Sequence, residues 1–453
     1  MPDRRTIRVG NVWSFMEERQ HWLELDGWCA VHPNGYWFSP KYKRGLWDGY
    51  IHFARNGRFP TGLLEWIEKK ASRSGIEITV SDERGNPPKW TPIGLVGVTL
   101  RDYQEEAVSA VLDTNFLGIP WPRGIIHMAT ASGKTNVLAA LAGGYGQVRV
   151  VILVHRQELL YQTAKVLAEV LGEDVGVIGD GRAVVERVTV GMVQTLIDYL
   201  DEPFLQEVGV LLIDECHRLN AMTHLKVVQA IPAYVRVGVS GTPFKSNDLA
   251  QKLRVLGTCG DVLYQKRADE LVNEGFIAPV TIQYATVMTP NAERLSWPDA
   301  YERCIVDSEE RNACIQQFVD ESLEPTLVIV SRLLHGELLA RRLECTFVSG
   351  AESSDFRQRV IQEMSAGMRR VLVASTIFDE GLDVPNVSRL VLAAGGKSEI
   401  QLLQRIGRGM RVSTGKERLE VLDFLDLGNR YTAKHSRERI ETAAQAGFTV
   451  EER

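Results

Sequence analysis

Short apolar runs rich in β-branched residues recur through the middle of the chain, and longer stretches with a helical period separate them. The runs predict strands at Gly124–Met128, Val148–Val154, Val188–Gly191, Val208–Ile213 and Val235–Val239. The intervening stretches predict helices at Asn136–Ala142 and Gln157–Leu171. The strands contain few charges, as expected where both faces of a sheet are covered. Such alternation is typical of an α/β domain built on a parallel sheet.

A second alternating series begins near Pro279. Its predicted strands are Thr326–Val330, Thr346–Val348, Val371–Ala374, Leu390–Leu392 and Leu419–Phe424. Its predicted helices are Leu334–Leu343, Asp355–Ser365 and Glu399–Met410, followed by a mixed-charge helix at Tyr431–Gln445. We therefore expect a second α/β domain of similar size, with the last helix packed on it.

The first 90 residues differ in composition from the rest of the chain. They carry 14 Lys and Arg against 11 Asp and Glu, whereas the remaining residues carry 38 against 47. Seven of the nine tryptophans also lie in this segment, which ends at the breaker cluster Arg84–Pro88. We predict three domains: a small aromatic and basic domain at 1–90, and two α/β domains at 91–275 and 276–453.

The overall composition is that of an ordinary soluble globular protein, with 453 residues of which 44% are hydrophobic and 24% are charged. No apolar stretch approaches the ~18 residues of a membrane helix. The first residues lack the apolar core of a signal peptide. The six cysteines are scattered without a CxxC pair, which argues against a zinc site and a disulfide framework. We expect a cytoplasmic protein without a membrane partner.

The segment Ala129–Thr135 lies between a predicted strand and a predicted helix and contains Gly-Lys-Thr. A phosphate-binding loop needs converging backbone N–H groups, a helix N-terminus, a lysine for the β- and γ-phosphates and a hydroxyl for Mg²⁺. Lys134 and Thr135 provide the last two. The strict pattern would place glycine at Met128, so a helix N-cap that happens to contain Gly-Lys-Thr is the alternative for this segment taken alone.

Two adjacent carboxylates, Asp214 and Glu215, follow the apolar strand Val208–Ile213. Ligands of parallel sheets bind outside the carboxyl ends of the strands. One carboxylate could hold Mg²⁺ through water, while the other takes a proton from the attacking water. A turn with solvated acids is the alternative for the pair alone, and the preceding phosphate-type loop favours the catalytic interpretation.

Two arginines, Arg408 and Arg411, lie three residues apart on one face of the predicted helix Glu399–Met410 and its end. Two guanidinium groups on one face could stabilise charge on a γ-phosphate. A basic helix face taken alone is more often simply solvated. The order of all the segments along the chain decides between these interpretations.

Seven segments follow the order of the motifs of superfamily 2 helicases. They are Leu100–Gln104, Ala129–Thr135, His155–Arg156, Asp214–His217, Ser240–Pro243, Ser375–Pro385 and Gln404–Arg411. Over about residues 95–430 the chain resembles superfamily 2 helicases and translocases of the DEAH-like branch, with Asp-Glu-Cys-His as its box. The resemblance implies two RecA-like parallel-sheet motor domains in tandem behind a small α+β domain. It also implies an ATP hydrolase that uses ATP and Mg²⁺.

The resemblance implies roles for individual residues. Adenine would be recognised by Arg101 and Gln104, and the phosphates would be bound by Thr130, Ser132, Gly133, Lys134 and Thr135. Mg²⁺ would be held by Thr135 and Asp214, the catalytic base would be Glu215, and the arginine fingers would be Arg408 and Arg411. Hydrolysis would be coupled to movement by His217 and Ser240–Thr242, and the second domain would approach the nucleotide with Gly381 and Asp383. The nucleic-acid backbone would be contacted by Arg156, Thr195, Ser331, Gly350 and Thr376. One departure is Ala131, where many relatives have glycine, and it leaves the geometry of the loop open.

The segment Gly35–Gly49 interleaves aromatic and basic residues. Aromatic rings can stack on bases while Lys and Arg neutralise phosphates, although the tryptophans of a small domain can equally form its core. Pro40–Gly49 and Phe59–Leu63 are similar to the N-terminal domain of phage UvsW-type helicases, a family that unwinds branched DNA, migrates junctions and anneals strands. This resemblance implies that DNA is contacted by Lys41, Lys43 and Arg44, in a bacterial or phage-infected cell.

The sequence thus favours an ATP-dependent DNA helicase or translocase that processes branched DNA in recombination, repair or replication. An RNA helicase is an open alternative, because a motor that binds the nucleic-acid backbone does not reliably distinguish DNA from RNA. The translocating motor of a restriction or repair assembly is another. A nucleotide-gated clamp with little turnover is disfavoured by the intact set Lys134, Asp214, Glu215 and Arg411. No segment identifies a protein partner.

Overall fold

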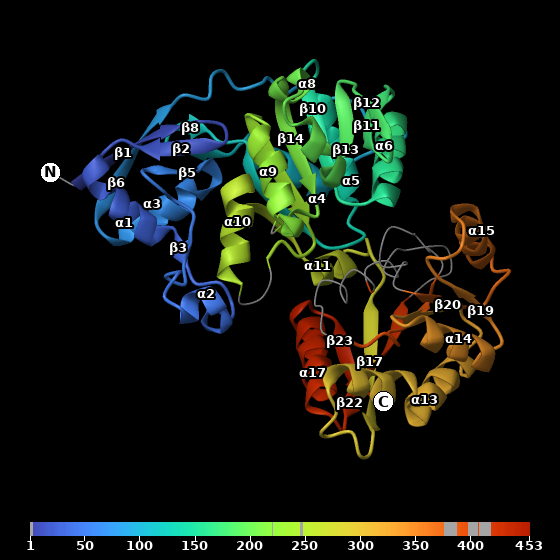
Figure 1. The fold of residues 1–453 in the computed structure, drawn as a ribbon. Coiled ribbons are helices and arrows are strands. Elements are labelled where there is room, and N and C mark those ends of the chain that lie inside the picture. The colour runs from blue at the N-terminus through green and yellow to red at the C-terminus, as the bar shows by residue number, and fades with distance from the viewer. Residues whose placement is uncertain (1–2, 220, 245–247, 376–386, 397–405, 407–417) are drawn as a thin grey trace. The chain divides into compact units, whose positions relative to one another are not determined.

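The computed structural model describes residues 3–219, 221–244, 248–375, 387–396, 406 and 418–453 (Figure 1). The chain forms two compact units, and each is described by itself. The first unit comprises Met1–Met128 and Gly133–Lys266, and the second comprises Ala129–Ser132 and Arg267–Arg453. The domain limits after residues 90 and 275 stay predictions.

The first unit begins with a small α+β structure. Its four-stranded sheet has the order β5-β2-β1-β6, formed by Arg58–Pro60, Trp13–Met16, Asp3–Val9 and Ile76–Asp82. Two helices accompany it, α1 (Trp22–Trp28) and α3 (Leu64–Arg73). Helix α3 buries Leu64, Ile67 and Ala71, which recur at helical spacing on one face.

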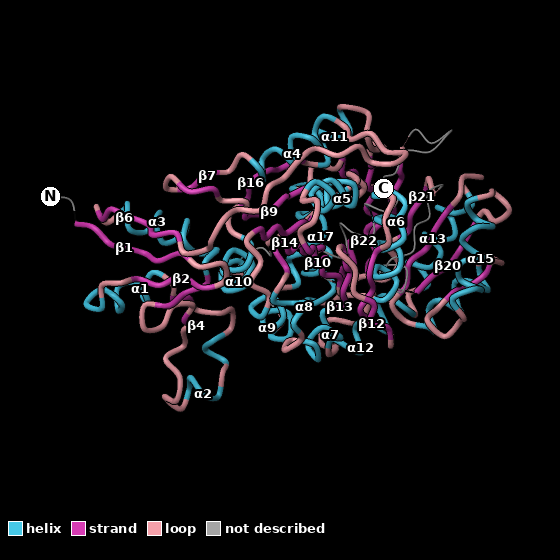
Figure 2. Tube along the Cα trace, turned by 90° about the horizontal axis from the view of Figure 1, so that it is seen from above, coloured by secondary structure: helices cyan, strands magenta, loops and turns pink. Residues whose placement is uncertain are grey.

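A lobe projects from this small domain (Figure 2). The lobe, residues 31–52, is closed at its base by the antiparallel pair β3 (Ala30–Val31) and β4 (Ile51–His52). It contains the short helix α2 (Pro40–Lys43), which begins at a proline because the first helical position needs no N–H donor. The aromatic and basic segment singled out in the sequence therefore lies on a protrusion rather than inside the domain.

An eight-stranded sheet forms the rest of the first unit. Its order is β12-β11-β13-β10-β14-β15-β9-β16, and every neighbouring pair is parallel except β11 with β12. In chain order the strands are β9 (Arg123–Met128), β10 (Arg149–Val154), β11 (Val175–Gly179), β12 (Arg182–Val184), β13 (Val188–Met192), β14 (Val208–Asp214), β15 (Val235–Ser240) and β16 (Val262–Lys266). The helices are α4 (Asp102–Leu112), α5 (Lys134–Gly144), α6 (Gln157–Leu171), α7 (Val193–Leu196), α8 (Pro203–Gln206), α9 (Met222–Ala230) and α10 (Leu249–Cys259). A small hairpin, β7 (Asn115–Phe116) with β8 (Ile119–Pro120), precedes β9.

The second unit contains a seven-stranded parallel sheet of order β19-β20-β18-β21-β22-β17-β23. In chain order the strands are β17 (Val280–Met288), β18 (Thr326–Val330), β19 (Thr346–Val348), β20 (Val371–Ser375), β21 (Arg389–Val391), β22 (Leu419–Leu427) and β23 (Thr449–Glu452). The helices are α11 (Ala268–Asn273), α12 (Trp297–Tyr301), α13 (Glu309–Asp320), α14 (Leu333–Arg342), α15 (Ser354–Ser365) and α17 (Arg430–Gln445). The predicted helix Glu399–Met410 lies outside the described residues except for Ile406.

The predicted fold class, two parallel-sheet α/β domains behind a small α+β domain, is confirmed. All ten predicted strands are present, most within a residue or two of their predicted limits, because strands buried on both faces leave continuous apolar runs. Within the described ranges, no helix combines the length and the apolar character needed to cross a membrane.

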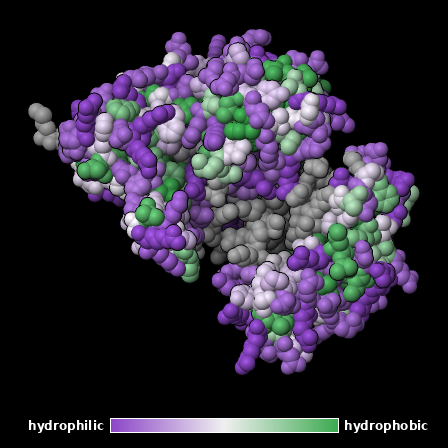
Figure 3. Space-filling model, in the orientation of Figure 1, coloured by the Kyte–Doolittle hydropathy of each residue, from purple (hydrophilic) through white to green (hydrophobic). Residues whose placement is uncertain are grey.

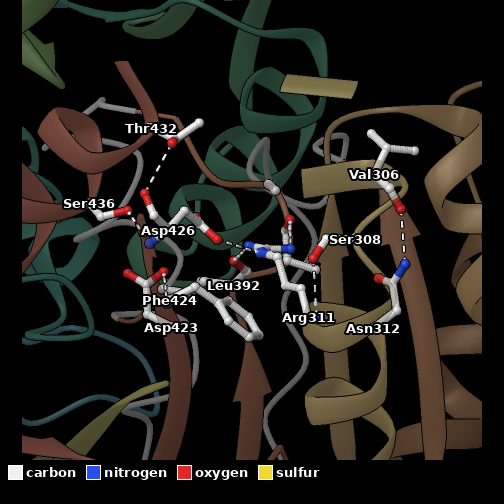
Figure 4. A network of polar contacts seen from close by, with 12 residues as sticks. Val306, Ser308, Arg311, Asn312, Leu392, Asp423, Phe424, Asp426, Thr432 and Ser436 are labelled. Carbon is white, nitrogen blue, oxygen red and sulfur yellow. Dashed lines mark hydrogen bonds and ion pairs between the residues drawn. The ribbon is translucent and has the colours of Figure 1, made fainter. Parts of the chain in front are cut away.

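Buried ion pairs lie at the centre of the second unit, and Figure 4 shows the one between Arg311 and Asp426. Arg311 Nε donates to Asp426 Oδ1 at 3.1 Å, and Arg311 Nη1 donates to Ala393 O at 2.9 Å. Arg439 Nε donates to Asp423 Oδ2 at 2.9 Å. All four charged side chains are buried, so each guanidinium group offsets the desolvation of the carboxylate that it faces.

Replacing Arg311 with methionine is expected to lower the free energy of unfolding of the second unit by about 3–5 kcal/mol, because Asp426 would keep a buried charge without its main partner. Denaturant unfolding monitored by circular dichroism measures the change. Arg341→Met, on the exposed side of α14, is the matched control and should change the value by less than about 0.5 kcal/mol. Equal stability of the two variants would contradict this account of the ion pair.

Candidate functional site

The loop after β9 leads directly into α5, which begins at Lys134. Gly133 has φ of 75°, and a Cβ at this position would lie 2.4 Å from Gln104 Nε2, so the loop requires glycine here. Ala131 also has a left-handed backbone, with φ of 66°, which explains why glycine suits that position. Lys134 Nζ lies 3.5 Å from Met128 O, at the start of the same loop. The helix N-terminus and the lysine are thus brought to one place, as anion binding requires.

The start of α4 lies beside this loop. The buried Gln104 accepts a hydrogen bond from Arg101 N through Oε1 at 3.0 Å, and its Nε2 lies 3.5 Å from Gly133 O. Arg101 is exposed, and its Nη1 donates to Tyr103 Oη at 3.1 Å. The structure therefore places the residues predicted for adenine recognition next to the predicted phosphate loop. Of the other loop residues, Ser132 is buried, whereas Thr130 and Thr135 are half-buried.

The acidic pair lies at the carboxyl end of β14, as the sequence predicted. Asp214 Oδ1 accepts a hydrogen bond from Glu215 N at 3.0 Å. Glu215 has a left-handed backbone with φ of 50°, and its Oε2 accepts a hydrogen bond from Ser240 Oγ at 3.1 Å. His217 Nδ1 lies 3.1 Å from both Glu215 Oε2 and Ser240 Oγ. The segments at the ends of β14 and β15 therefore meet at the Glu215 carboxylate.

The two carboxylates have opposite pKa shifts. Burial and the neighbouring charge of Glu215 raise the pKa of Asp214 to about 7. Burial also opposes ionisation of Glu215, but the hydrogen bond with His217, the charge of Lys134 and the hydrogen bond from Ser240 outweigh it and lower its pKa to about 2. Glu215 therefore ionises more readily than Asp214. A cation beside Asp214 would favour ionisation of that carboxylate as well.

Further contacts fix the segment that follows β15. Ser240 Oγ accepts a hydrogen bond from Thr242 N at 3.1 Å, and His127 Nε2 lies 3.0 Å from Gly241 O. Gln251 of α10 is fully buried, and its Nε2 contacts His217 O at 3.2 Å and Pro243 O at 3.1 Å. Gln251 could not be predicted from the sequence, because no motif near it in the chain marks it.

The residues predicted to contact nucleic acid in the first motor domain follow adjacent parallel strands. Arg156 comes after β10 and Thr195 comes after β13, and both are half-buried. Gln194 Nε2 donates to His155 O at 2.9 Å and joins the two loops. Burial, with the nearby charges of Arg218 and Arg156, lowers the pKa of His155 to about 3, so its neutral ring accepts from Arg156 Nε at 3.0 Å.

In the second unit, Ser331 follows β18 and Gly350 follows β19, and both are exposed. Strand β20 lies between β18 and β19 in the sheet. Five predicted site residues lie outside the described residues: Thr376, Gly381, Asp383, Arg408 and Arg411.

The lobe exposes both kinds of side chain that its sequence suggested. Lys41, Lys43 and Arg44 are exposed, and Trp37 and Phe38 keep 51% and 70% of their surface accessible. Figure 3 shows polar and apolar surface side by side on the lobe. Within residues 31–52, the His32 ring stacks on Tyr36 and on Tyr50, with centroids 4.0 and 3.8 Å away. The alternative interpretation, that tryptophans form part of the core, applies to three others. These are Trp22, Trp28 and Trp66, which pack against the buried hydrophobic cluster of the first unit.

Three family descriptions match successive parts of the chain. Residues 15–81 match the N-terminal domain of DNA helicase UvsW, residues 97–245 match the res subunit of type III restriction enzymes, and residues 309–413 match the helicase conserved C-terminal domain. The ATP-dependent DNA helicase uvsW of Enterobacteria phage T4 is 23% identical, and the alignment covers 95% of each chain. The chain belongs to the superfamily 2 helicases of the UvsW type. The resemblance drawn from the order of the motifs is thereby confirmed.

Two further similar proteins cover a smaller share of this UvsW-type helicase. The DNA 3'-5' translocase XPB2 of Sulfurisphaera tokodaii is 25% identical over 69% of this chain and 79% of its own length. The structure of S. cerevisiae Dbp5 bound to RNA and ADP BeF3 has a TM-score of 0.54 at 16% identity, over 78% of this chain and 89% of Dbp5, and shows a shared fold. As a superfamily 2 helicase, the chain is an ATP-dependent enzyme with a nucleic-acid substrate.

Proposed function

We propose that this chain is an ATP-dependent DNA helicase or translocase that unwinds, migrates or anneals branched DNA in recombination, repair or replication. The observation that carries the proposal is that the similarity to phage T4 uvsW extends over 95% of each chain, including the small N-terminal domain. The exposed lobe gives that domain a basic and aromatic surface suited to nucleic acid. We also propose that it acts inside a bacterial or phage-infected cell, and the similarity to a phage helicase supports this.

Mg²⁺ suits the chemistry of the two residues that we propose hold it, Thr135 and Asp214. Asp214 offers a carboxylate oxygen, and the side chain of Thr135 offers a hydroxyl oxygen. The described residues contain no group of three or more His, Cys, Asp or Glu that could hold a metal, which suits an ion that keeps several waters and binds phosphate oxygens. When bound with ATP, Mg²⁺ would neutralise charge on the phosphates. Lys134 would neutralise further phosphate charge from the start of α5.

Glu215 would accept the proton of the attacking water. Its carboxylate has a lowered pKa and is held by Ser240 and His217, so its lone pairs are oriented before the reaction begins. Arg101 and Gln104 would bind adenine, and Gly381 and Asp383 would contribute from the second domain. Arg408 and Arg411 would contact the γ-phosphate of ATP. The protein would therefore interact differently with ATP and with the hydrolysis products, as directional movement requires.

Nucleic acid would be bound along its backbone rather than by base sequence. In the first unit the proposed contacts are Arg156 and Thr195, and in the second they are Ser331, Gly350 and Thr376. In the lobe, Lys41, Lys43 and Arg44 would neutralise phosphates, with Trp37 and Phe38 positioned to stack on unpaired bases.

Replacing Lys41, Lys43 and Arg44 together with alanine is expected to weaken binding to branched DNA. The slope of log affinity against log salt should fall by about one per residue removed, because fewer counterions are released. Fluorescence anisotropy over a salt series measures this slope. Arg4, Arg8 and Arg73, exposed elsewhere in the same domain, give a triple alanine control of equal net charge. An affinity and salt slope equal to those of the wild type would remove the lobe from the interface.

A further inference from the structure

Helix α10 connects the small N-terminal domain to the segments at the ends of β14 and β15. The domain, the helix and these segments all lie in the first unit, so the contacts can be followed from one end of the helix to the other. The helix has 11 residues and spans about 16 Å.

The first turn of α10 is attached to the ATPase segments. Asp248 caps the helix by accepting a hydrogen bond from Gln251 N at 2.9 Å. The side-chain amide of Gln251 has two hydrogens and two carbonyl acceptors, His217 O at 3.2 Å and Pro243 O at 3.1 Å. His217 in turn contacts the carboxylate of the proposed catalytic base, Glu215. Because Gln251 is fully buried, its loss would leave both carbonyl groups without this donor.

The last turn of α10 is attached to two buried arginines. Thr258 O lies 3.2 Å from Arg123 Nη1 and 3.3 Å from Arg236 Nε. Cations at this end of a helix interact favourably with its dipole. Arg123 also donates through Nη2 to Asn11 O in the small domain. The same guanidinium group therefore holds the end of α10 and the backbone of the N-terminal domain.

The small domain also packs along the side of α10. Gly62, in the buried 3-10 turn Thr61–Leu63, lies so close that a Cβ there would be 2.1 Å from Leu256 O. Leu63 belongs to the same continuous hydrophobic cluster as Leu253 and Leu256. On the surface, an ion pair joins Lys69 of α3 to Asp261, just after α10.

We propose that α10 transmits the binding of nucleic acid at the N-terminal domain to the ATPase segments, with Gln251 as the positioning residue. The inference rests on the proposed function. A helix fixed at both ends moves as one body, so a shift of the turn Thr61–Leu63 would reach the backbone of His217 and Pro243. Binding of DNA at the lobe and ATP turnover at Glu215 would then be energetically coupled. Couplings between two sites typically change the affinity at one site by about 5- to 150-fold when the other is occupied.

The test compares ATP turnover of the full chain with and without saturating forked DNA. Lys69→Glu, which sets a like charge against Asp261, should leave DNA-free turnover unchanged and lower the stimulation by forked DNA by about 2- to 5-fold, the scale of an exposed ion pair. Lys69→Arg, and the charge exchange Lys69→Glu with Asp261→Lys, should restore the stimulation. Gln251→Leu should lower the DNA-stimulated kcat while the KM for ATP stays within about 2-fold, and thermal melting checks that each variant is folded. Arg73→Ala on the same helix is the control.

Wild-type stimulation in Lys69→Glu and Gln251→Leu would overturn the proposal while leaving the proposed function intact. A loss in Lys69→Glu that the charge exchange does not repair would overturn it as well, because the effect would then not depend on the contact with Asp261. If forked DNA fails to stimulate the wild-type chain, the proposed function fails first and this inference fails with it.

Discussion

Replacing Lys134 with alanine is expected to lower kcat for ATP hydrolysis by about 10²- to 10³-fold and to weaken ATP binding. Lys134 is the first residue of α5, so the helix N-terminus and the ammonium group would act on the same phosphates in the proposed site. Removing the ammonium group leaves phosphate charge uncompensated both before and during the reaction. Steady-state turnover and binding of a fluorescent ATP analogue measure the two effects separately.

Lys165→Ala provides the matched control, because Lys165 is exposed on α6 and forms a surface pair with Glu169. It should leave turnover and ATP affinity unchanged. ATP turnover in Lys134→Ala within a few-fold of the control would contradict the assignment of the phosphate loop.

Replacing Glu215 with glutamine is expected to lower kcat by about 10²- to 10⁴-fold, the contribution of a general base, while ATP affinity changes little. Glutamine has nearly the same shape and can still accept the hydrogen bond from Ser240, but it cannot take a proton from water. The split between kcat and affinity distinguishes this variant from Lys134→Ala. Single-turnover hydrolysis and equilibrium ATP binding provide the two measurements.

Glu207→Gln is the control for Glu215→Gln, since Glu207 is exposed and pairs with Arg149 at the surface. Unchanged hydrolysis in Glu215→Gln would exclude the carboxylate as the base. Loss of ATP binding to the same extent as loss of turnover would show that Glu215 acts on nucleotide binding instead.

The central strands of both sheets could be predicted because burial on both faces leaves a continuous apolar run, as in Val208–Ile213. Strand β17 escaped prediction because Val280–Met288 contains polar residues between its buried ones. Strand β12 is exposed along its whole length, so no hydrophobic pattern marks it. In each case the missing signal is burial on both faces rather than backbone propensity.

The residues of the phosphate loop and the acidic pair could be predicted because each group is contiguous in the sequence. The arrangement that joins them could not. Gln251 and His217 are 34 residues apart, and the contact depends on how α10 packs. The left-handed conformation of Ala131 could not be predicted either, because the sequence does not distinguish a left-handed alanine from any other alanine.

The most direct test of the central claim is the rate of ATP hydrolysis with single-stranded, duplex and forked DNA and with RNA, at matched nucleotide concentration. We predict strong stimulation by forked or single-stranded DNA and little by RNA. Equal or greater stimulation by RNA would contradict the proposed DNA substrate, and absence of hydrolysis with every nucleic acid would contradict the proposed motor.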